Sequence, residues 1–382
     1  MRHERQVELL QRVADAGPLG AGMFAARSMV NPASAYADPQ RYAKEMRVLF
    51  RDGPTLLGLS CEMANPGDYL STTLDGVPVM AVRQADGSVR AMVNACRHRA
   101  APLVQQRSGN VGRAIVCGYH GWTYDTDGAL RARPRSGGAF DDVTLACDLH
   151  RVAVAEGYGL IFVRAGSADP IDIDDALGGA QDDLGSFGLA GFTHIETRTN
   201  EWNMNWKLIL DTFTESYHIR SLHKNTLAGT FASDCTIFEA FGRNLLSVGL
   251  RSNVLEEMAK PEAERSLLPY GTIQYFLVPN ALVVYQLDHL EVWRLEPLGV
   301  GRVRTHTSLF APEPPTEKAL RYWTKNLDLL LQVTGTEDFP VMEKIHAAMA
   351  SGAIPEVVYG RIEPPLIYLH TSLNAALAAA ET

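Results

Sequence analysis

The chain has 382 residues, a length typical of two domains rather than one. Hydrophobic residues make up 46% of it and charged residues 21%, so the chain can bury a sizeable core. Against 44 Asp and Glu there are 35 Lys and Arg, a formal net charge of −9, which argues against nucleic acid or an anionic membrane as a general partner.

The cysteines indicate the redox environment. Their odd number and wide spacing do not suit a disulfide framework but suit a reducing compartment, where cysteine is a core residue or a metal ligand. The amino-terminal residues carry charges every few positions without an apolar segment of signal-peptide length, and no later apolar run is long enough to span a bilayer. We therefore expect a cytoplasmic protein. The five cysteines are Cys61, Cys96, Cys117, Cys147 and Cys235.

The first half of the chain predicts two short helices followed by a small all-β region. Apolar residues recur at helical spacing over residues 4–15, and a second helix is expected over 39–50. From residue 51 to 165, short β-like runs alternate with Asp-Gly turns, which are typical of hairpins. The predicted strands include residues 77–84, 89–95, 113–119 and 153–166.

An acidic, glycine-rich stretch over residues 166–188 is interpreted as a surface connection and a domain boundary. The second half predicts an antiparallel sheet with covering helices, so the fold class is α+β. Its expected strands are 193–200, 271–278, 281–287, 291–297 and 303–311, and its expected helices are a segment after residue 203, 317–333 and a last one over 339–350. The predicted domains are residues 1–48 (a helical segment packing on the last domain), 49–165 and 166–382.

Two predicted loops each carry one cysteine and one histidine: Cys96 and His98, then Cys117 and His120. A Cys2His2 zinc finger usually pairs Cys with Cys and His with His, whereas here each loop mixes the two. Mixed loops suit a pair of sulfide-bridged irons, in which one iron takes both thiolates and the other both imidazoles. A structural zinc site and two unrelated Cys–His pairs are the alternatives.

The strings CRHRAAP and CGYHGWTYDTDG resemble the Rieske-type [2Fe–2S] domain, whose pattern is C-x-H followed by C-x-x-H-G-W. This resemblance implies that Cys96 and Cys117 bind one iron of the cluster and that His98 and His120 bind the other.

A second group of ionisable residues lies in NWKLILDTFTESYHIRSLHK. His218 and His223 are five residues apart, so one face of a straight helix does not hold both, and the helix must end or be distorted between them. At helical spacing Asp211, Glu215 and His218 would share one face. Two histidines and a distant carboxylate form the facial triad of non-haem Fe(II) oxygenases, although such a group is also common as a purely structural one.

This string resembles the catalytic helix of Rieske non-haem iron oxygenases, the aromatic-ring-hydroxylating α-subunit family. The resemblance covers about residues 45–370 and implies a catalytic domain of the helix-grip type. It implies that His218 and His223 bind a mononuclear Fe(II) and that Glu215 bridges to a cluster-binding histidine of a neighbouring subunit. The third ligand should be a late carboxylate at a helix start, for which Asp338 fits the pattern best and Glu337 is the rival.

Two positions depart from the family's pattern. Many relatives have Asn where this chain has Thr212, so any role of that Asn near the iron is absent here. The bridging acid is Glu215 rather than the commoner Asp, a choice shared with several relatives that oxidise amines.

The resemblance implies a terminal oxygenase that hydroxylates or oxidatively demethylates a small aromatic or N- or O-methylated substrate with O2. No nucleotide-binding motif is present, so electrons from NAD(P)H need a separate reductase and, in some systems, a ferredoxin. Because the two metals of one chain lie far apart in relatives, a head-to-tail homotrimer is expected. Four arginines near the cluster loops are candidates for the reductase contact or simply solvated: Arg97, Arg99, Arg107 and Arg113.

Two other activities stay open. One is cis-dihydroxylation of an aromatic ring, and the other, from a different class, is electron transfer by a Rieske protein with an inactive iron site. Candidate walls of the substrate pocket, which are equally typical of plain core, are Tyr275, Phe276, Tyr285, Leu330 and Val333. Asp288 and His289 lie at a turn between predicted strands and are expected to be exposed.

Overall fold

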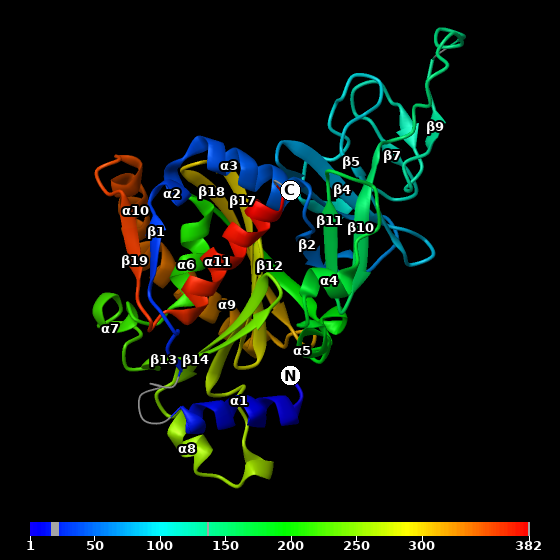
Figure 1. Cartoon of the computed structure of the whole chain (residues 1–382). Helices are drawn as coiled ribbons and strands as arrows, with labels where there is room; N and C mark the ends of the chain where they lie inside the picture. Colours follow the sequence, from blue (N-terminus) through cyan, green and yellow to red (C-terminus); the bar gives the residue numbers. More distant parts are fainter. Residues whose placement is uncertain (17–22, 136, 381–382) are drawn as a thin grey trace. The chain divides into compact units, whose positions relative to one another are not determined.

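The computed structural model describes residues 1–16, 23–135 and 137–380 (Figure 1). Its contacts divide the chain into two compact units. One, here called the β unit, is Met46–Ala176; the other, the α+β unit, combines Met1–Glu45 with Leu177–Thr382. No helix in the described parts combines the length and the apolar character needed to cross a membrane.

The β unit is built on a seven-stranded sheet in the order β2-β11-β10-β5-β4-β3-β6, with a separate sheet of β7, β8 and β9. Asp75 and Gly76 join β3 to β4 with φ values of 47° and 76°, as a two-residue hairpin turn requires. The predicted Asp-Gly hairpins are therefore confirmed. The strands are β2 (Thr55–Leu59), β3 (Asp68–Leu74), β4 (Val77–Arg83), β5 (Val89–Val93), β6 (Ser108–Asn110), β7 (Ile115–Val116), β8 (Thr123–Tyr124), β9 (Leu130–Ala132), β10 (Arg151–Gly157) and β11 (Leu160–Arg164).

The strand expected over residues 113–119 is only two residues long, because the chain turns immediately after it. The backbone N–H of Gly121 donates to the carbonyl of Cys117 at 2.9 Å, and Gly121 has a φ of 73°. This turn ends β7 at Val116 and presents the second Cys–His loop.

The α+β unit contains a seven-stranded antiparallel sheet in the order β12-β18-β17-β16-β15-β14-β13. Its later strands were predicted to within two residues, and the α+β expectation is confirmed. The edge hairpin of β13 and β14 was not predicted. The strands are β12 (Thr193–Trp202), β13 (Phe231–Phe241), β14 (Asn244–Arg251), β15 (Gly271–Leu277), β16 (Ala281–Gln286), β17 (His289–Gly299) and β18 (Arg302–Ala311).

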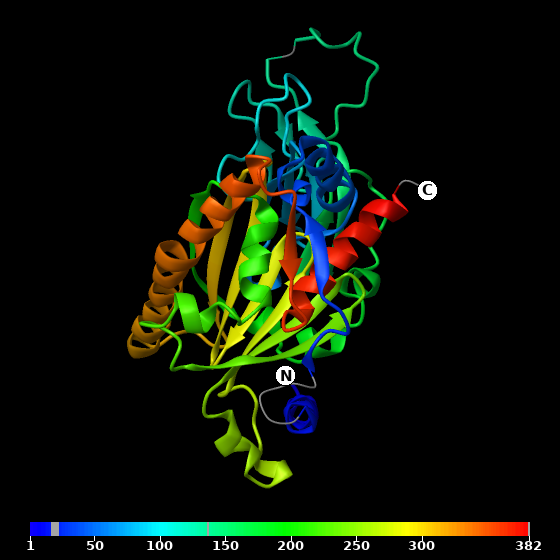
Figure 2. The same ribbon diagram turned by 60° about the vertical axis from the view of Figure 1, so that its left-hand side comes forward.

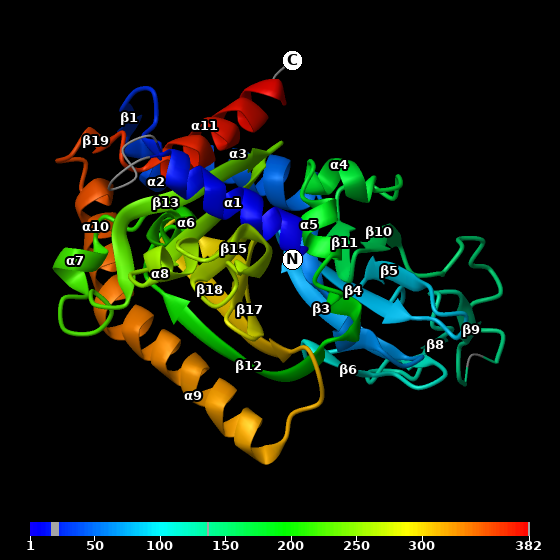
Figure 3. The ribbon, with the colours of Figure 1, turned by 90° about the horizontal axis from the view of Figure 1, so that it is seen from below.

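Helices α6, α9, α10 and α11 gather on one face of this sheet (Figure 2). Helix α6 places Phe213 5.2 Å from the ring of Trp293 on β17, and α9 packs Leu327 against Leu309 of β18. Figure 3 shows α9 running beside β12 and β18. The longer helices are α1 (His3–Asp15), α6 (Trp206–Thr214), α9 (Glu317–Val333), α10 (Phe339–Ala350) and α11 (Pro364–Ala379); the shorter ones are α2 (Ser34–Ala37), α3 (Pro39–Glu45), α7 (Ile219–Leu222) and α8 (Val254–Met258).

The two ends of the chain meet in this unit. Strand β1 (Met29–Pro32) pairs antiparallel with β19 (Glu356–Tyr359), and the Nδ2 of Asn31 donates to the hydroxyl of Tyr359 at 2.9 Å. The helix over 339–350 was expected to be the last, but α11 follows it, so that expectation was wrong. The expected helix over 39–50 is α3 followed by a π-helical turn, Met46–Arg51.

The stretch 166–188 is not a bare surface connection, as the sequence had suggested. It forms α4 (Ile173–Leu177) and α5 (Gln181–Gly185). Leu177 and Leu184 are fully buried, so these acidic residues flank apolar ones that belong to a core.

A buried ion pair holds the start of α6. The Lys207 Nζ lies 2.6 Å from Glu45 Oε2, and both side chains are fully buried. Glu45 also accepts hydrogen bonds from Arg41 Nε at 2.9 Å and from the indole N–H of Trp206 at 3.2 Å. Burial lowers the pKa of Lys207, while the charge of Glu45 opposes that change. Removing one partner would leave the other charge unpaired in the core.

We predict that Glu45→Gln lowers the free energy of unfolding of the α+β unit by about 3 kcal/mol, because it leaves the buried Lys207 ammonium without its carboxylate partner. Denaturant unfolding followed by tryptophan fluorescence measures the change. Glu317→Gln, at an ion pair with Arg321 in which both side chains are exposed, is the control and should change stability by less than about 0.5 kcal/mol. Equal stability of the Glu45 variant and the parent would contradict the prediction.

Candidate functional site

Helix α6 stops just before the predicted iron ligands. It ends at Thr214, and Glu215 is extended with φ −139° and ψ 153°. His218 and His223 then flank the four-residue helix α7 at its two ends. Of the two alternatives that the sequence left open, the helix therefore ends. This break turns the two imidazoles, which a continuous helix would hold 140° apart, toward each other, with ring centroids 5.1 Å apart.

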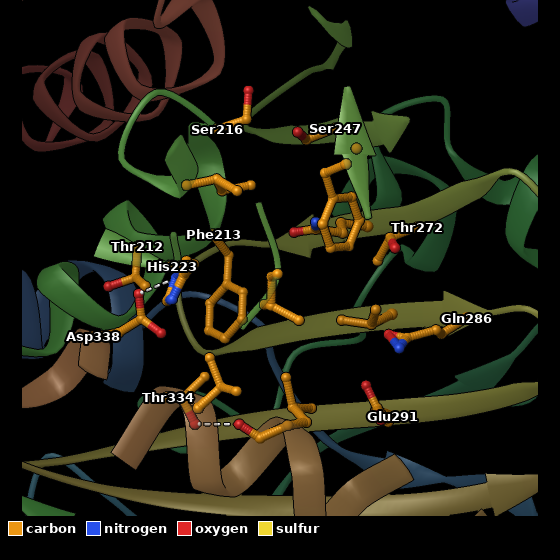
Figure 4. Close-up of a pocket in the computed structure, with 18 of the residues that line it drawn as sticks. Thr212, Phe213, Ser216, His223, Ser247, Thr272, Gln286, Glu291, Thr334 and Asp338 are labelled. Carbon is orange, nitrogen blue, oxygen red and sulfur yellow. Dashed lines mark hydrogen bonds and ion pairs between the residues drawn. The ribbon is translucent and has the colours of Figure 1, made fainter. Parts of the chain in front are cut away.

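Asp338 completes a convergent group. It ends a π-helical turn, Thr334–Asp338, inserted between α9 and α10, and such turns are frequent at functional sites. Its Oδ1 lies 3.4 Å from His218 Nε2 and 3.0 Å from His223 Nε2. One ligand atom from each of the three residues lies within 4.8 Å of the others, and Figure 4 shows His223 and Asp338 side by side.

The other nitrogen of each imidazole is held by a glutamate. His218 Nδ1 is paired with Glu215 Oε1, and His223 Nδ1 lies 2.9 Å from Glu337 Oε2. The hydrogen bond with His223 lowers the pKa of Glu337. Carboxylates at both Nδ1 atoms fix the tautomer in which each Nε2 lone pair faces Asp338, the arrangement usual for metal-binding histidines. The sequence had placed Glu337 as a rival ligand, but here it orients His223.

The donor atoms fit a divalent iron. Asp338 is buried, and although its Oδ1 faces both Nε2 atoms, this oxygen accepts no hydrogen bond from the described residues. A buried carboxylate oxygen without a donor is costly unless a cation or a proton completes it. Two imidazoles and one carboxylate are the ligand set of the non-haem iron facial triad.

Asp211 does not take part in this group, so the expectation that it shares a face with Glu215 was wrong. Because α6 ends before Glu215, helical spacing does not connect the two residues. Asp211 instead accepts hydrogen bonds from Tyr36 at 2.5 Å and from His370 at 3.0 Å. Burial, together with the charge of Asp211, raises the pKa of Tyr36 well above its usual value. This network ties α6 to the amino-terminal segment and α11.

A cavity opens beside the three convergent residues, with about 1050 Å3 of space not filled by atoms, including its solvent-filled mouth. Among the predicted wall residues, Leu330 and Val333 line it, whereas Tyr275, Phe276 and Tyr285 do not. Successive strand residues point to opposite faces, and Tyr275 and Tyr285 pack on Phe187 on the far side of the sheet. The assignment of the two tyrosines to the pocket was therefore wrong.

The sheet contributes polar residues to the cavity lining that the sequence analysis missed. Thr272, Gln286 and Glu291 line the cavity, and Figure 4 shows them across it from His223 and Asp338. His289 was expected to be exposed but is fully buried, because β17 already begins at this residue. The alternation of polar residues on β15, β16 and β17 was the available signal.

The β unit brings the two Cys–His loops together. Cys96 and Cys117 are buried, with relative exposures of 3% and 2%, while His98 and His120 lie nearer the surface with their Nδ1 atoms 3.1 Å apart. The hydroxyl of Tyr124 lies 3.2 Å from Cys96 Sγ. Two buried sulfurs and two imidazole nitrogens facing each other fit the donor set of a Rieske cluster.

The four arginines near these loops have different surroundings. Arg99 donates to the hydroxyl of Tyr119 at 3.2 Å, and Arg107 donates to the carbonyl of Leu57 at 3.0 Å. Arg97 is paired with the ring of His150, and Arg113 is exposed. Their part in contacting a reductase stays a prediction.

Comparisons with known proteins show the family to which the chain belongs. The family model described as "Ring hydroxylating alpha subunit (catalytic domain)" matches residues 189–379, and the "Rieske [2Fe-2S] domain" model matches residues 54–146. The glycine betaine monooxygenase oxygenase subunit of Chromohalobacter salexigens is 28% identical over 340 residues, which cover 77% of this chain and 75% of that protein. Putrescine 2-hydroxylase of Ralstonia nicotianae is 28% identical over 294 residues, 74% of this chain and 76% of that protein.

A solved quaternary ammonium Rieske monooxygenase has the same fold, with a TM-score of 0.78, 19% identity, and coverage of 94% of this chain and 98% of that one. The two matched segments lie in the β unit and the α+β unit, and they contain Cys96, His98, Cys117 and His120 in the first and His218, His223 and Asp338 in the second. The chain belongs to the ring-hydroxylating α-subunit family, the Rieske oxygenases that join a [2Fe–2S] domain to a non-haem iron catalytic domain.

Proposed function

We propose that this oxygenase hydroxylates, or oxidatively demethylates, a small organic substrate as the terminal component of a multicomponent system. The observation that carries the proposal is the convergence of His218 and His223 on one buried oxygen of Asp338 beside a cavity. Relatives named for oxidising glycine betaine and putrescine support a nitrogen-containing substrate.

We assign His218, His223 and Asp338 as the ligands of a mononuclear Fe(II). When bound, this iron with O2 supplies the oxidising power for attack on a substrate C–H bond. Glu215 and Glu337 hold the Nδ1 protons, so that both Nε2 atoms face the metal position without rotating. Because both glutamates are carboxylates rather than carbonyls, they also raise the basicity of the two imidazoles.

The cavity walls supply the binding surface. Phe213, Trp293, Leu330 and Val333 are apolar lining residues, so a substrate that enters displaces water and gains from burial of its carbon skeleton. Thr212 donates its hydroxyl to the carbonyl of Leu208 at 2.8 Å and is therefore engaged with its own helix.

In the β unit we assign Cys96, His98, Cys117 and His120 as the ligands of a Rieske [2Fe–2S] cluster. The residue ranges 49–165 and 166–382 are proposed as the cluster-binding and catalytic domains, with 1–48 as a segment of the latter. Neutral imidazoles in place of two thiolates raise the potential of such a cluster. Tyr124 adds a hydroxyl near Cys96 Sγ, and hydrogen bonds to ligand sulfurs tune the potential further.

The remaining components are proposed from the resemblance to the family and, for the reductase, from the missing nucleotide-binding motif. O2 is the proposed co-substrate, and NAD(P)H is the proposed electron source through a separate reductase, with a ferredoxin where the system has one. A homotrimer, in which Glu215 of one subunit approaches a cluster histidine of the next, is the proposed assembly. The cytoplasm is its proposed location.

A single turnover tests the function. Chemically reduced enzyme is mixed with O2 and a panel of N-methyl amines, methoxy-aromatics and aromatic acids, and formaldehyde and product masses are read together. We expect a product that contains oxygen from O2, with formaldehyde where a methyl group is lost. A product gaining two oxygens and two hydrogens would instead indicate cis-dihydroxylation. If the purified protein forms no product and also does not bind the mononuclear iron, the electron-transfer function would be favoured.

Iron content distinguishes the proposed third ligand, Asp338, from its neighbour Glu337. Asp338→Ala should lose nearly all mononuclear iron while the visible absorption of the cluster is unchanged, because a metal ligand is removed. Glu337→Gln keeps an acceptor for His223 Nδ1–H and should weaken iron binding by about tenfold to a hundredfold. Metal analysis after dialysis against increasing chelator measures both. Greater iron loss from the Glu337 variant would make Glu337 the ligand.

Glu215→Gln tests the proposed bridge. At saturating iron the variant should keep its mononuclear iron and its cluster absorption, because Gln still accepts the Nδ1–H of His218, but its turnover should fall by at least about tenfold since the carboxylate charge is gone. Steady-state product formation with the reductase measures this loss. Glu337→Gln, which changes the other Nδ1 partner, serves as the comparison and should retain more activity at saturating iron. Undiminished turnover in Glu215→Gln would remove the bridging role.

A further inference from the structure

Glu291 occupies an unusual position for a carboxylate. It lies on β17, fully buried, and its side chain lines the catalytic cavity. The strand register places it in one row with Val284 of β16 and Gln274 of β15, which also line the cavity. In Figure 4 Glu291 and the pair His223 and Asp338 lie at opposite ends of the cavity, with Phe213 between them.

Neither oxygen of this carboxylate has a hydrogen-bond donor in the described structure. Its nearest charged neighbour is His289, whose Nε2 lies 3.5 Å from Oε1 outside hydrogen-bond geometry, and whose Nδ1 lies 3.1 Å from Asp288 Oδ1. Burial disfavours protonation of His289, but the two carboxylates outweigh it and raise its pKa. A protonated His289 would offset the charge of Glu291, since Asp288 is 55% exposed to solvent, but its Nε2 donates no hydrogen bond to either Glu291 oxygen.

The neighbouring strands add acceptors rather than cations. Gln274 Oε1 and Thr272 Oγ1 are buried, line the cavity and have no hydrogen-bond partner in the part of the chain that the structure describes. Two lining residues, Trp293 and Asn326, offer unpartnered N–H donors, but neither carries a charge that could offset Glu291. No Lys or Arg is among the described residues that line the cavity.

A buried carboxylate without donors raises the free energy of the empty protein, and the cost is recovered when a cation binds it. Ammonium groups that carry N–H are the ligands that satisfy such a set, because each N–H donates to one acceptor. Quaternary ammonium groups carry the charge but have no N–H, and they are held instead by aromatic faces.

We propose that Glu291 binds the protonated amine of the substrate, through N–H donation to its carboxylate and to Gln274 Oε1, at the end of the cavity away from His218, His223 and Asp338. This inference rests on the proposed function, which it deepens by naming the substrate class. The substrate is then an amine whose charged nitrogen is anchored at one end, while a carbon farther along the molecule faces the oxidising site. Glu291 is thus a residue that determines substrate specificity.

Binding without turnover tests the proposal. The iron-loaded enzyme with its cluster is titrated anaerobically by calorimetry with n-butylamine, n-hexylamine and n-octylamine. Each amine is compared with the alcohol and the trimethylammonium compound of the same chain length. We expect at least one amine to bind at least about tenfold more tightly than its alcohol and its trimethylammonium analogue. Glu291→Gln should remove that preference by lowering amine affinity at least about tenfold.

Glu296→Gln is the matched control. It changes a carboxylate on the same strand that is paired with Arg304 and does not line the cavity, and it should leave amine affinity unchanged. Iron content and circular dichroism show whether each variant is folded. Equal affinity of amines and alcohols, equal affinity of amines and trimethylammonium compounds, unchanged affinity in Glu291→Gln, or no binding by any amine would each overturn the proposal.

The result is separable from that of the turnover experiment. Amine binding that depends on Glu291, in an enzyme that forms no oxygenated product, would keep this inference and remove the proposed function. Oxygenation of a neutral aromatic compound, with no amine bound, would do the reverse.

Discussion

The catalytic unit depends on a helix that is held firmly at one end and stops at the other. The buried pair of Lys207 and Glu45 and the hydrogen bonds from Tyr36 and His370 to Asp211 fix α6 in the core. The helix then ends at Thr214, and only because it ends can His218 and His223 face the same oxygen of Asp338. Helix α6 fixes the position of the site, and the non-helical residues after Thr214 fix the geometry of the two histidines.

How far the sequence predicted this structure differs between elements. The Asp-Gly hairpins and α9 were predicted well because local turn chemistry and helical periodicity decide them. The ligand set was predicted from a resemblance, and the His218–His223 spacing alone showed that a straight helix was impossible. The edge hairpin of β13 and β14 and the last helix α11 were missed, because their apolar patterns are short or nearly continuous and give no clear period.

The site's less visible residues could not be predicted in the same way. Asp338 fitted the sequence pattern best but Glu337 beside it was a rival, and the π-helical turn decides which carboxylate faces the imidazoles and which one holds an Nδ1. Tyr275 and Tyr285 were misplaced because strand register, which sets the face that each residue occupies, was unknown. The same register brings Gln274 and Glu291 into one row, a relation between strands that no local pattern contains.

The pairing of β1 with β19 has a consequence for how the protein forms on the ribosome. The β unit is continuous in sequence, so it can fold as soon as residue 176 has emerged. Met1–Glu45 precedes the β unit in the chain but belongs to the unit whose other part, Leu177–Thr382, follows it, and Met29–Pro32 has no strand partner until Tyr359 has left the exit tunnel. During synthesis Glu45 stays without Lys207 for the translation time of the whole β unit, so the unit that carries the cavity can assemble completely only after Tyr359 has emerged.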